Sequence, residues 1–319
     1  MRYINANGVN LAFTRSGTGP LVVLLHGFPE NHHSWRHQVE AISAAGFQVI
    51  APDLRGFGES GRPERVEDYS VVHYVGDVVA LIAAAGADRA VVVGHDWGSV
   101  PAWGLAMMRP DLVRGVIGIS GPPIPRGPVG MATGSKGVFP DGRRFYLDYF
   151  QDQGVADAEF DSDPRATLRG MLHTLSYENP ADDVDQRMVV RPGAGMLGTW
   201  RDPGRLSDWL SERDFDAFAR PYEVHGFTPS LAFYRNLDRN WELTAPFEGV
   251  RLTAPAMLVL GERDVVRFMP GVPELVERLP DEHPGFRRTL VVPGAGHWVQ
   301  QEQPEIVSKT IIEFLEELS

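Results

Sequence analysis

Cysteine is absent from the 319 residues of this chain. Disulfides, thiolate nucleophiles and cysteine-ligated metals are therefore excluded. Positively charged residues are also few, because the chain has 30 lysines and arginines but 42 aspartates and glutamates, which gives a formal net charge of −12. A nucleic-acid partner would need a basic face to neutralise phosphates, and an anionic membrane would have no general attraction for this chain. Neither partner is expected.

Long apolar runs are missing as well. The run LVVLL at 21–25 is far too short to span a bilayer. The first residues, MRYINANGVNLAF, lack the basic start and apolar stretch of a signal peptide. Repeats and low-complexity segments are also absent, and 43% hydrophobic with 23% charged residues is the composition of an ordinary folded enzyme. We expect a cytoplasmic protein, and the sequence leaves its oligomeric state open, a homo-oligomer included.

Apolar runs alternate with helical patterns over residues 21–120. Strands are predicted at 21–25, 47–53, 90–95 and 113–120, and helices at 34–45, 73–86 and 97–108. Continuous Val/Ile/Leu strands separated by helices predict a mostly parallel sheet covered on both faces, which is an α/β fold.

The alternation breaks at 121–131, where GPPIPRGPVGM holds four prolines. Proline disrupts both helices and strand ladders, so this segment marks a boundary. The residues that follow are rich in Asp, Arg and aromatics and predict helices and loops without strand periodicity. We therefore predict a core interrupted by an inserted helical cap, with core residues 1–123, cap residues 124–246 and core residues 247–319.

Strand patterns resume after the cap, at 254–264 and 288–297. A final helix is predicted at 304–318, with apolar residues at helical spacing that suit packing on a sheet. These residues are Val307, Ile311, Phe314, Leu315 and Leu318.

The segment Gly94-His95-Asp96-Trp97-Gly98 joins a predicted strand to a predicted helix. This is the G-x-nucleophile-x-G turn of α/β-hydrolases, which presents the central residue at the carboxyl end of the sheet. Glycines are needed on both sides because a side chain there would collide with the neighbouring strand and helix. The alternative is that Asp96 only caps the next helix.

Aspartate in place of serine at this turn restricts the chemistry. A carboxylate that attacks an acyl carbon forms a reactive anhydride, which is a poor intermediate for an esterase. The same carboxylate attacking an sp³ carbon forms an alkyl ester, which water can hydrolyse. Asp96 therefore indicates an alkyl electrophile, either an epoxide or a carbon–halogen bond.

Backbone N–H groups are the candidate donors to the oxyanion that forms when this ester is hydrolysed. His26-Gly27-Phe28-Pro29 follows the strand at 21–25, where this fold supplies one such donor. The amides of Phe28 and Trp97 are the candidates, and one donor of this kind contributes about 3 kcal/mol. The alternative is a strand that simply ends in a proline turn.

The candidate base is His297, in the glycine-rich segment Pro-Gly-Ala-Gly-His-Trp after the last strand. Asp264 ends the preceding strand, at the usual place for a carboxylate that orients the base. The order nucleophile, acid, base is that of α/β-hydrolases. Glu262 is the nearest competitor of Asp264, and a solvated turn is the alternative for both.

Together these motifs resemble the soluble epoxide hydrolases of the α/β-hydrolase fold. The matching segments are HGFPE (26–30), SWRHQ (34–38), DLRGFGES (53–60), VGHDWGS (93–99), GERD (261–264) and GHWVQQEQPE (296–305). The resemblance implies hydrolysis of an epoxide by water to a vicinal diol, with neither metal nor organic cofactor. It also implies a cis Phe28–Pro29 bond.

The resemblance further implies two cap tyrosines that bind and protonate the epoxide oxygen. Tyr146, in the segment YLDYFQ, and Tyr234, in FYRN, stand at the matching positions. A phenol suits this task because an alkoxide leaves poorly without an acid. Tyr149 is the alternative to Tyr146, and packing within the cap is the alternative role for all of them.

The nearest competing function is that of a haloalkane dehalogenase, which shares the Asp nucleophile and a following Trp. Those enzymes carry Asn where this chain has Phe28, and they lack the tyrosine pair. Fluoroacetate-type dehalogenases carry Arg where this chain has Trp97. A ligand receptor with the same fold would have lost a triad residue, and none is lost here.

Overall fold

A computed structural model describes residues 1–179 and 185–318, so residues 180–184 of the predicted cap lie outside the described part. Its centre is an eight-stranded sheet in the order β1-β2-β4-β3-β5-β6-β9-β10. The strands are β1 (Arg2–Ala6), β2 (Val9–Ser16), β3 (Leu21–Leu25), β4 (Gln48–Pro52), β5 (Ala90–His95), β6 (Val113–Ile119), β9 (Ala256–Gly261) and β10 (Phe286–Val292).

The sheet is mostly parallel, as the sequence predicts. All neighbouring pairs from β4 across to β10 are parallel, and β3, β4, β5 and β9 are buried along their whole length. The sequence analysis missed β1 and β2, which form an antiparallel hairpin. Its turn is Asn7-Gly8, with positive φ at both residues, a typical two-residue hairpin turn. Both strands are partly exposed, so they lack the apolar runs that identify the buried strands.

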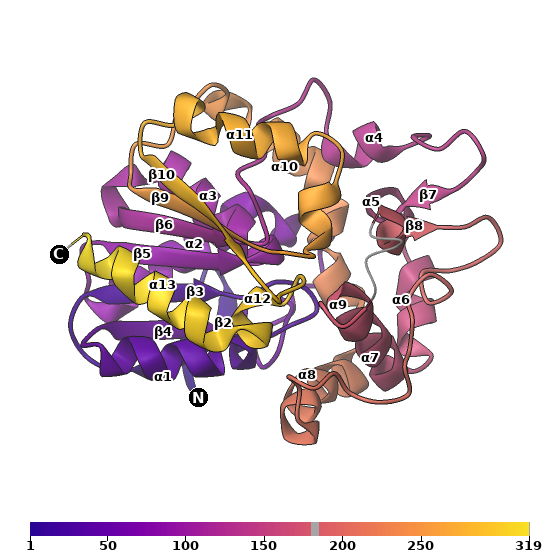
Figure 1. The fold of residues 1–319 in the computed structure, drawn as a ribbon, viewed down its shortest axis with the longest axis horizontal. Helices are drawn as coiled ribbons and strands as arrows, with labels where there is room; N and C mark the ends of the chain where they lie inside the picture. Colours follow the sequence, from indigo (N-terminus) through magenta and orange to yellow (C-terminus); the bar gives the residue numbers. More distant parts are fainter. Residues whose placement is uncertain (180–184, 319) are drawn as a thin grey trace.

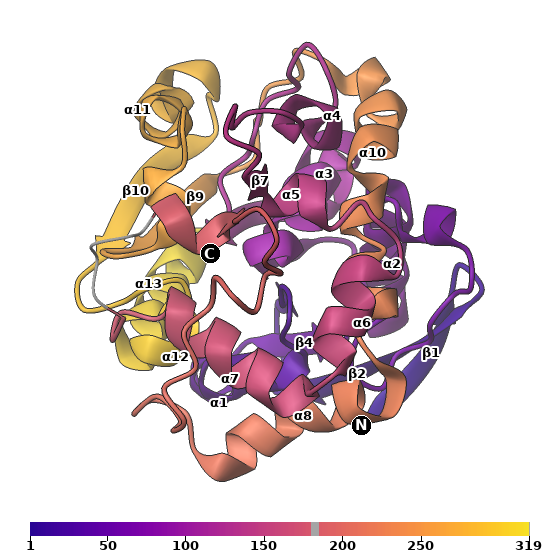
Figure 2. The ribbon, with the colours of Figure 1, turned by 90° about the vertical axis from the view of Figure 1, so that its right-hand side faces the viewer.

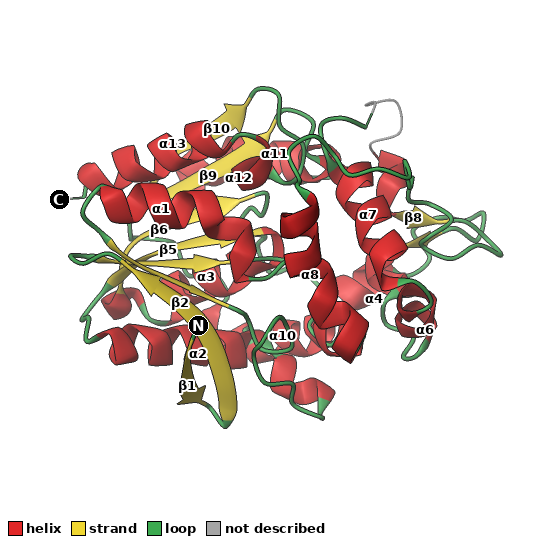
Figure 3. Cartoon of the chain, turned by 90° about the horizontal axis from the view of Figure 1, so that it is seen from below, coloured by secondary structure: helices red, strands yellow, loops and turns green. Residues whose placement is uncertain are grey.

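Helices cover both faces of the sheet, as Figure 3 shows. α1 (Arg36–Ala44) and α13 (Pro304–Glu316) pack on one face, while α2 (Val71–Ala85) and α3 (Ser99–Met108) pack on the other. The remaining core helices are α11 (Val272–Glu282), which was not predicted, and the short α12 (Val299–Glu302). The predicted inward face of the last helix is confirmed for Val307, Ile311, Phe314 and Leu315, which are buried in the same cluster as the α1 side chains. Leu318 lies beyond the end of α13 and packs, partly buried, against that cluster.

Between β6 and β9 the chain forms helices that gather beyond one end of the sheet (Figures 1 and 2). They include α4 (Met131–Ser135), α5 (Tyr146–Tyr149), α6 (Val155–Asp161), α7 (Pro164–Leu175), α8 (Glu212–His225), α9 (Thr228–Leu231), η7 (Tyr234–Asn236) and α10 (Leu237–Leu243). One feature departs from the predicted helices and loops. The strands β7 (Arg144–Phe145) and β8 (Val189–Val190) form a two-stranded sheet. Each strand has two residues, which is too few to produce a strand periodicity in the sequence.

This helical segment contacts the carboxyl end of the sheet, since the His297 N–H donates to the Leu175 carbonyl at the end of α7 (2.9 Å). The division at 123/124 and 246/247 stays a prediction. Within the described residues, no helix combines the length and the apolar character that crossing a membrane requires.

Candidate active site

Asp96 occupies the sharp turn between β5 and α3, with a φ of +50°. Non-glycine residues seldom adopt this conformation, and such strain concentrates at functional turns. The flanking glycines are required, because a Cβ on Gly94 would collide with the Gly98 carbonyl oxygen and one on Gly98 with that of Leu25. α3 has Gly98 as its N-cap and no side-chain capping bond, so the alternative role of Asp96 as a helix cap is wrong.

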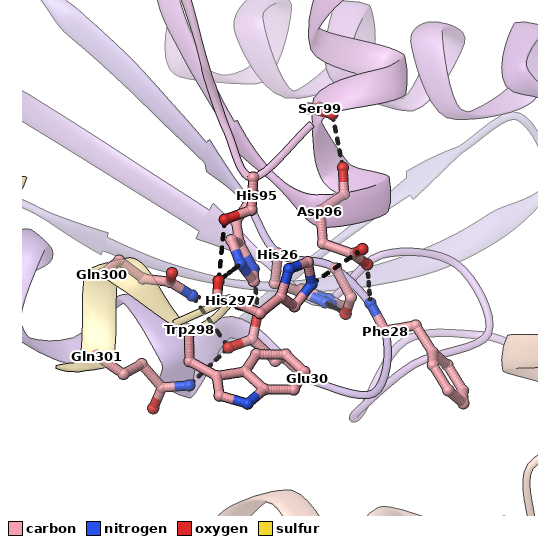
Figure 4. Close-up of polar contacts among 12 residues, drawn as sticks. His26, Phe28, Glu30, His95, Asp96, Ser99, His297, Trp298, Gln300 and Gln301 are labelled. Atoms are coloured by element: carbon pink, nitrogen blue, oxygen red, sulfur yellow. Dashed lines mark hydrogen bonds and ion pairs between the residues drawn. The ribbon is translucent and has the colours of Figure 1, made fainter. Parts of the chain in front are cut away.

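His297 lies between two carboxylates (Figure 4 shows it beside Asp96). Its Nε2 is 3.3 Å from Asp96 Oδ2, and its Nδ1 is 2.9 Å from Asp264 Oδ1. His297 and Asp264 are almost fully buried. Glu262, the competitor of Asp264, instead accepts a hydrogen bond from the Gly294 N–H (3.0 Å). This geometry favours Asp264 as the partner of the imidazole.

The charges around His297 determine its protonation. Burial disfavours the imidazolium, but Asp264 and Asp96 outweigh burial and raise the pKa of His297 to about 10. Asp264 has a lowered pKa, because the interaction with His297 overcomes the effect of burial. A charged imidazole between two carboxylates is the resting state that follows.

The Phe28 N–H donates to Asp96 Oδ1 at 3.0 Å, and the Phe28–Pro29 bond is cis. A Cβ on Gly27 would collide with the Asp96 side chain, so glycine is needed beside this donor. Trp97 follows Asp96 directly in η3 (Asp96–Gly98). Among the described residues, its amide makes no hydrogen bond to the Asp96 carboxylate.

Tyr146 and Tyr234 are buried side by side, with ring centroids 6.1 Å apart. Burial, and after it the negative charge of Asp96, raises the pKa of both phenols. Tyr234 also packs edge-on against Trp97, at 4.9 Å between centroids. Tyr149 differs, because its hydroxyl donates to Glu159 Oε2 within the helical segment (2.7 Å). The geometry thus favours Tyr146 over Tyr149 as the first cap tyrosine.

A small, mostly apolar cavity lies beside Trp97 and Tyr234, and its lining includes these two residues, Phe28 and Phe233. One of the two phenols, Tyr234, therefore borders an apolar space, together with Phe28 and Trp97, the two residues whose amides are the candidate oxyanion donors. No cluster of His, Cys, Asp or Glu that could hold a metal ion occurs in residues 1–179 and 185–318.

The backbone of His297 is held by groups that the sequence analysis did not select. The His297 carbonyl accepts a bond from Ser120 Oγ (3.0 Å) and lies 2.9 Å from His95 Nε2. The other ring nitrogen of His95 is 2.7 Å from the buried carboxylate of Glu30 (Figure 4). Glu30 and His95 stand inside the HGFPE and GHDWG motifs, so the signal was present, but only the fold brings them together.

Glu302 also holds the His297 loop, which is the segment between β10 and α12 that contains His297. Its carboxylate accepts N–H bonds from Gly296 and Trp298, the neighbours of His297, at 3.1 Å each. A third bond comes from the Tyr177 N–H, just beyond α7, at 2.8 Å. Burial raises the pKa of Glu302 to about 7, although these three bonds oppose the increase. One carboxylate thus ties the His297 loop to the helical segment above it.

Comparison with known proteins agrees with this site. A family model described as the alpha/beta hydrolase fold matches residues 20–304. Epoxide hydrolase A of Mycobacterium tuberculosis is 38% identical over 317 residues, covering 98% of this chain and 96% of the relative. Epoxide hydrolase 2 of Siraitia grosvenorii is 36% identical, with coverage of 98% and 96%.

Solved structures give the same result. An epoxide hydrolase from an endophytic Streptomyces superimposes with a TM-score of 0.95 at 36% identity, covering 99% of this chain and 95% of the other. Epoxide hydrolase A from Mycobacterium thermoresistibile gives a TM-score of 0.91 at 40% identity, with coverage of 99% and 97%. The chain belongs to the epoxide hydrolases of the α/β-hydrolase fold. The haloalkane dehalogenase alternative is not favoured.

Proposed function

We propose that this protein hydrolyses small-molecule epoxides to vicinal diols through an alkyl ester on Asp96. The observation that carries the proposal is the position of the Asp96 carboxylate, 3.3 Å from the His297 imidazole. The next residue, Trp97, packs against the buried Tyr234, which in turn packs against the buried Tyr146. The carboxylate suits attack on an alkyl carbon, the imidazole suits activation of water, and the phenols suit protonation of an alkoxide.

In the first step, Tyr146 and Tyr234 hold the epoxide oxygen by hydrogen bonds. One oxygen of Asp96 attacks a ring carbon from the side opposite the C–O bond, which breaks. The bonding electrons move to the epoxide oxygen, and that oxygen takes a proton from a tyrosine. Asp96 Oδ1 already accepts the Phe28 N–H, so Oδ2 is the attacking oxygen and Oδ1 becomes the ester carbonyl.

In the second step, His297 removes a proton from water while Asp264 orients its ring. The water oxygen attacks Cγ of Asp96, and the negative charge that develops on Oδ1 is stabilised by the amides of Phe28 and Trp97. The bond between Cγ and the alkylated oxygen then breaks, and that oxygen takes the proton held by His297 as the diol leaves. The new carboxyl group of Asp96 gives up the second proton of the water, which restores the tyrosine that protonated the epoxide oxygen. The attacking oxygen of Asp96 departs with the product, and the water oxygen remains in the enzyme.

We further propose that residues 124–246 act as a cap on the core, residues 1–123 and 247–319. Support comes from α5 and η7, which supply the two tyrosines, and from the bonds that join Leu175 and Tyr177 to the His297 loop. Substrate would enter between the cap and the core. Closure of the cap would keep bulk water away from the alkoxide until it is protonated.

The test is a single turnover in ¹⁸O-water with enzyme in excess over a reactive aryl epoxide. We expect a diol without label and ¹⁸O in the peptide that contains Asp96. Label in the diol of the first turnover would mean direct attack by water and would refute the ester mechanism. A panel of aryl and aliphatic epoxides with a haloalkane control measures the substrate class.

The variant His297→Gln isolates the first step. It should still form the ester, which then accumulates as a mass increase equal to the epoxide, because hydrolysis without the general base is slower by roughly 10²–10⁴-fold. Absence of an adduct with an epoxide that the wild type converts would contradict the two-step scheme.

A further inference from the structure

The two tyrosines lie on elements too short to fix their own positions. α5 consists of the four residues Tyr146–Tyr149, and η7 of the three residues Tyr234–Asn236. Single turns have little intrinsic stability and depend on tertiary contacts. Tyr146 and Tyr234 are also separated by most of the helical segment, so contacts between α5 and η7 must determine how far apart the hydroxyls lie.

Gln151 supplies such a contact. Its Nε2 donates one hydrogen bond to the Leu147 carbonyl (2.7 Å) and one to the Tyr234 carbonyl (3.0 Å). Leu147 directly follows Tyr146, so a single amide group joins the backbones of both tyrosine segments. A primary amide nitrogen has two N–H donors, and here each is used once.

A second contact anchors the same two segments on the other side of Tyr234. The Arg235 guanidinium donates to the Phe150 carbonyl (Nε, 3.2 Å) and pairs through both terminal nitrogens with the Asp157 carboxylate. Arg235 and Asp157 are nearly buried, and a paired, two-pronged bond of this kind is strong and directional. Arg235 therefore attaches η7 to α6, while Gln151 bonds the Tyr234 carbonyl itself and the carbonyl of Leu147, the residue after Tyr146.

We propose that Gln151 is a positioning residue that sets the spacing of Tyr146 and Tyr234, so that both hydroxyls reach one epoxide oxygen. The proposal rests on the proposed function of the two tyrosines. An acid must lie within hydrogen-bond reach of the atom it protonates. A misplacement of about 1 Å at such a site can cost roughly 10²-fold in rate.

Two variants of Gln151 test this proposal. Gln151→Glu keeps the shape but replaces the donor nitrogen by an oxygen that repels both carbonyls, and Gln151→Met keeps the length without any donor. The matched control is Gln153→Glu, which makes the same charge change two residues further on, at an exposed side chain. Thermal unfolding of all three variants checks that each is folded.

Stopped-flow tryptophan fluorescence separates formation of the ester from its hydrolysis. We expect both Gln151 variants to slow ring opening by roughly 10–100-fold, since one well-placed acid contributes about 10²–10⁴-fold. Ester hydrolysis should stay within about twofold of the wild type, because it depends on His297. Gln153→Glu should match the wild type in both steps.

A second readout distinguishes positioning from a general loss of structure. An epoxide with electron-withdrawing substituents gives a less basic alkoxide and needs less help from an acid. It should lose less rate in the Gln151 variants than an unsubstituted epoxide does. Equal losses with both epoxides, equal losses in both steps, or ring opening at the wild-type rate would each overturn the proposal.

Failure of the proposed function would be seen separately, as a wild-type enzyme without an ester phase. If Gln151→Glu does not fold, Gln151→Met tests the proposal by the same two readouts, the separate rates of the two steps and the comparison of the two epoxides.

Discussion

Replacing Asp96 by asparagine should lower the pKa of His297. In the resting enzyme the imidazolium is buried, and it is retained because Asp264 and Asp96 raise its pKa to about 10. Asparagine has nearly the same shape as aspartate and removes one of these two charges. The substitution therefore measures how strongly Asp96, the proposed nucleophile, holds a proton on His297, the proposed base.

The size of the effect follows from the distance of 3.3 Å between His297 Nε2 and Asp96 Oδ2. With an effective dielectric constant of about 20, the attraction between unit charges at this distance is about 5 kcal/mol. At 1.36 kcal/mol per pKa unit, this corresponds to between three and four units. The Asp96 side chain is 17% exposed, so water screens part of the field, and we expect a decrease of roughly two to three units.

This decrease has a consequence for the reaction. Alkylation of Asp96 removes the same negative charge that the asparagine variant lacks. Formation of the ester should therefore lower the pKa of His297 and free its Nε2 to act as a base in the next step. The first chemical step would then prepare the second.

The pKa change also fixes the sign of a stability effect. Because the pKa of His297 is raised above that of an unfolded histidine, near 6.5, the charged imidazole stabilises the fold fully below about pH 6.5. This contribution is lost as the pH rises toward 10. In Asp96→Asn it should be smaller and should be lost at a lower pH.

The assay is a pH titration by NMR of protein labelled with ¹⁵N in the histidine rings. The His297 signals are assigned from their absence in His297→Gln, and intact mass checks that the introduced asparagine has not hydrolysed back to aspartate. Asp88→Asn, at an exposed position, is the charge-matched control. A His297 pKa in Asp96→Asn within about half a unit of the wild type would refute the reasoning.

Two further predictions concern single residues. Tyr234→Phe should slow ring opening by roughly 10–100-fold and leave ester hydrolysis largely intact, because the second phenol still assists and only the first step needs an acid. Tyr149→Phe, which loses only the bond to Glu159, should open the ring at nearly the wild-type rate, and stopped-flow fluorescence compares the two. Glu302→Gln should slow ester hydrolysis more than ring opening, because an amide cannot accept all three N–H bonds that hold the His297 loop. Glu305→Gln, at an exposed position at the start of α13, is the control and should change neither rate. If Glu302→Gln slowed ring opening and ester hydrolysis equally, or no more than Glu305→Gln does, a role for Glu302 in holding His297 would be contradicted.

Much of the fold follows from local patterns. Buried parallel strands such as β3 and β5 are continuous apolar runs, and the glycines around Asp96 are required by contacts between adjacent elements. The β1–β2 hairpin was missed because its strands are half exposed, and α11 because its sequence carries two prolines, Pro273 and Pro280. Local signals fail where exposure or proline weakens periodicity.

The chemical type of the proposed nucleophile was predicted from the sequence alone. Asp96, its place in a strand–turn–helix segment, and the later order of Asp264 and His297 are local facts about the chain. They indicate attack on an alkyl carbon whatever the exact packing. The family motifs then limit the electrophile to an epoxide.

The tertiary structure alone decided which side chains meet at the carboxylate. It favours Tyr146 over Tyr149 as the first cap tyrosine, because the Tyr149 hydroxyl is bonded to Glu159. It also joined Gln151 to the Tyr234 carbonyl and Glu302 to the Tyr177 amide, across 83 and 125 residues of sequence. Such contacts depend on how distant segments pack, and no periodicity or motif spacing records a distance between them.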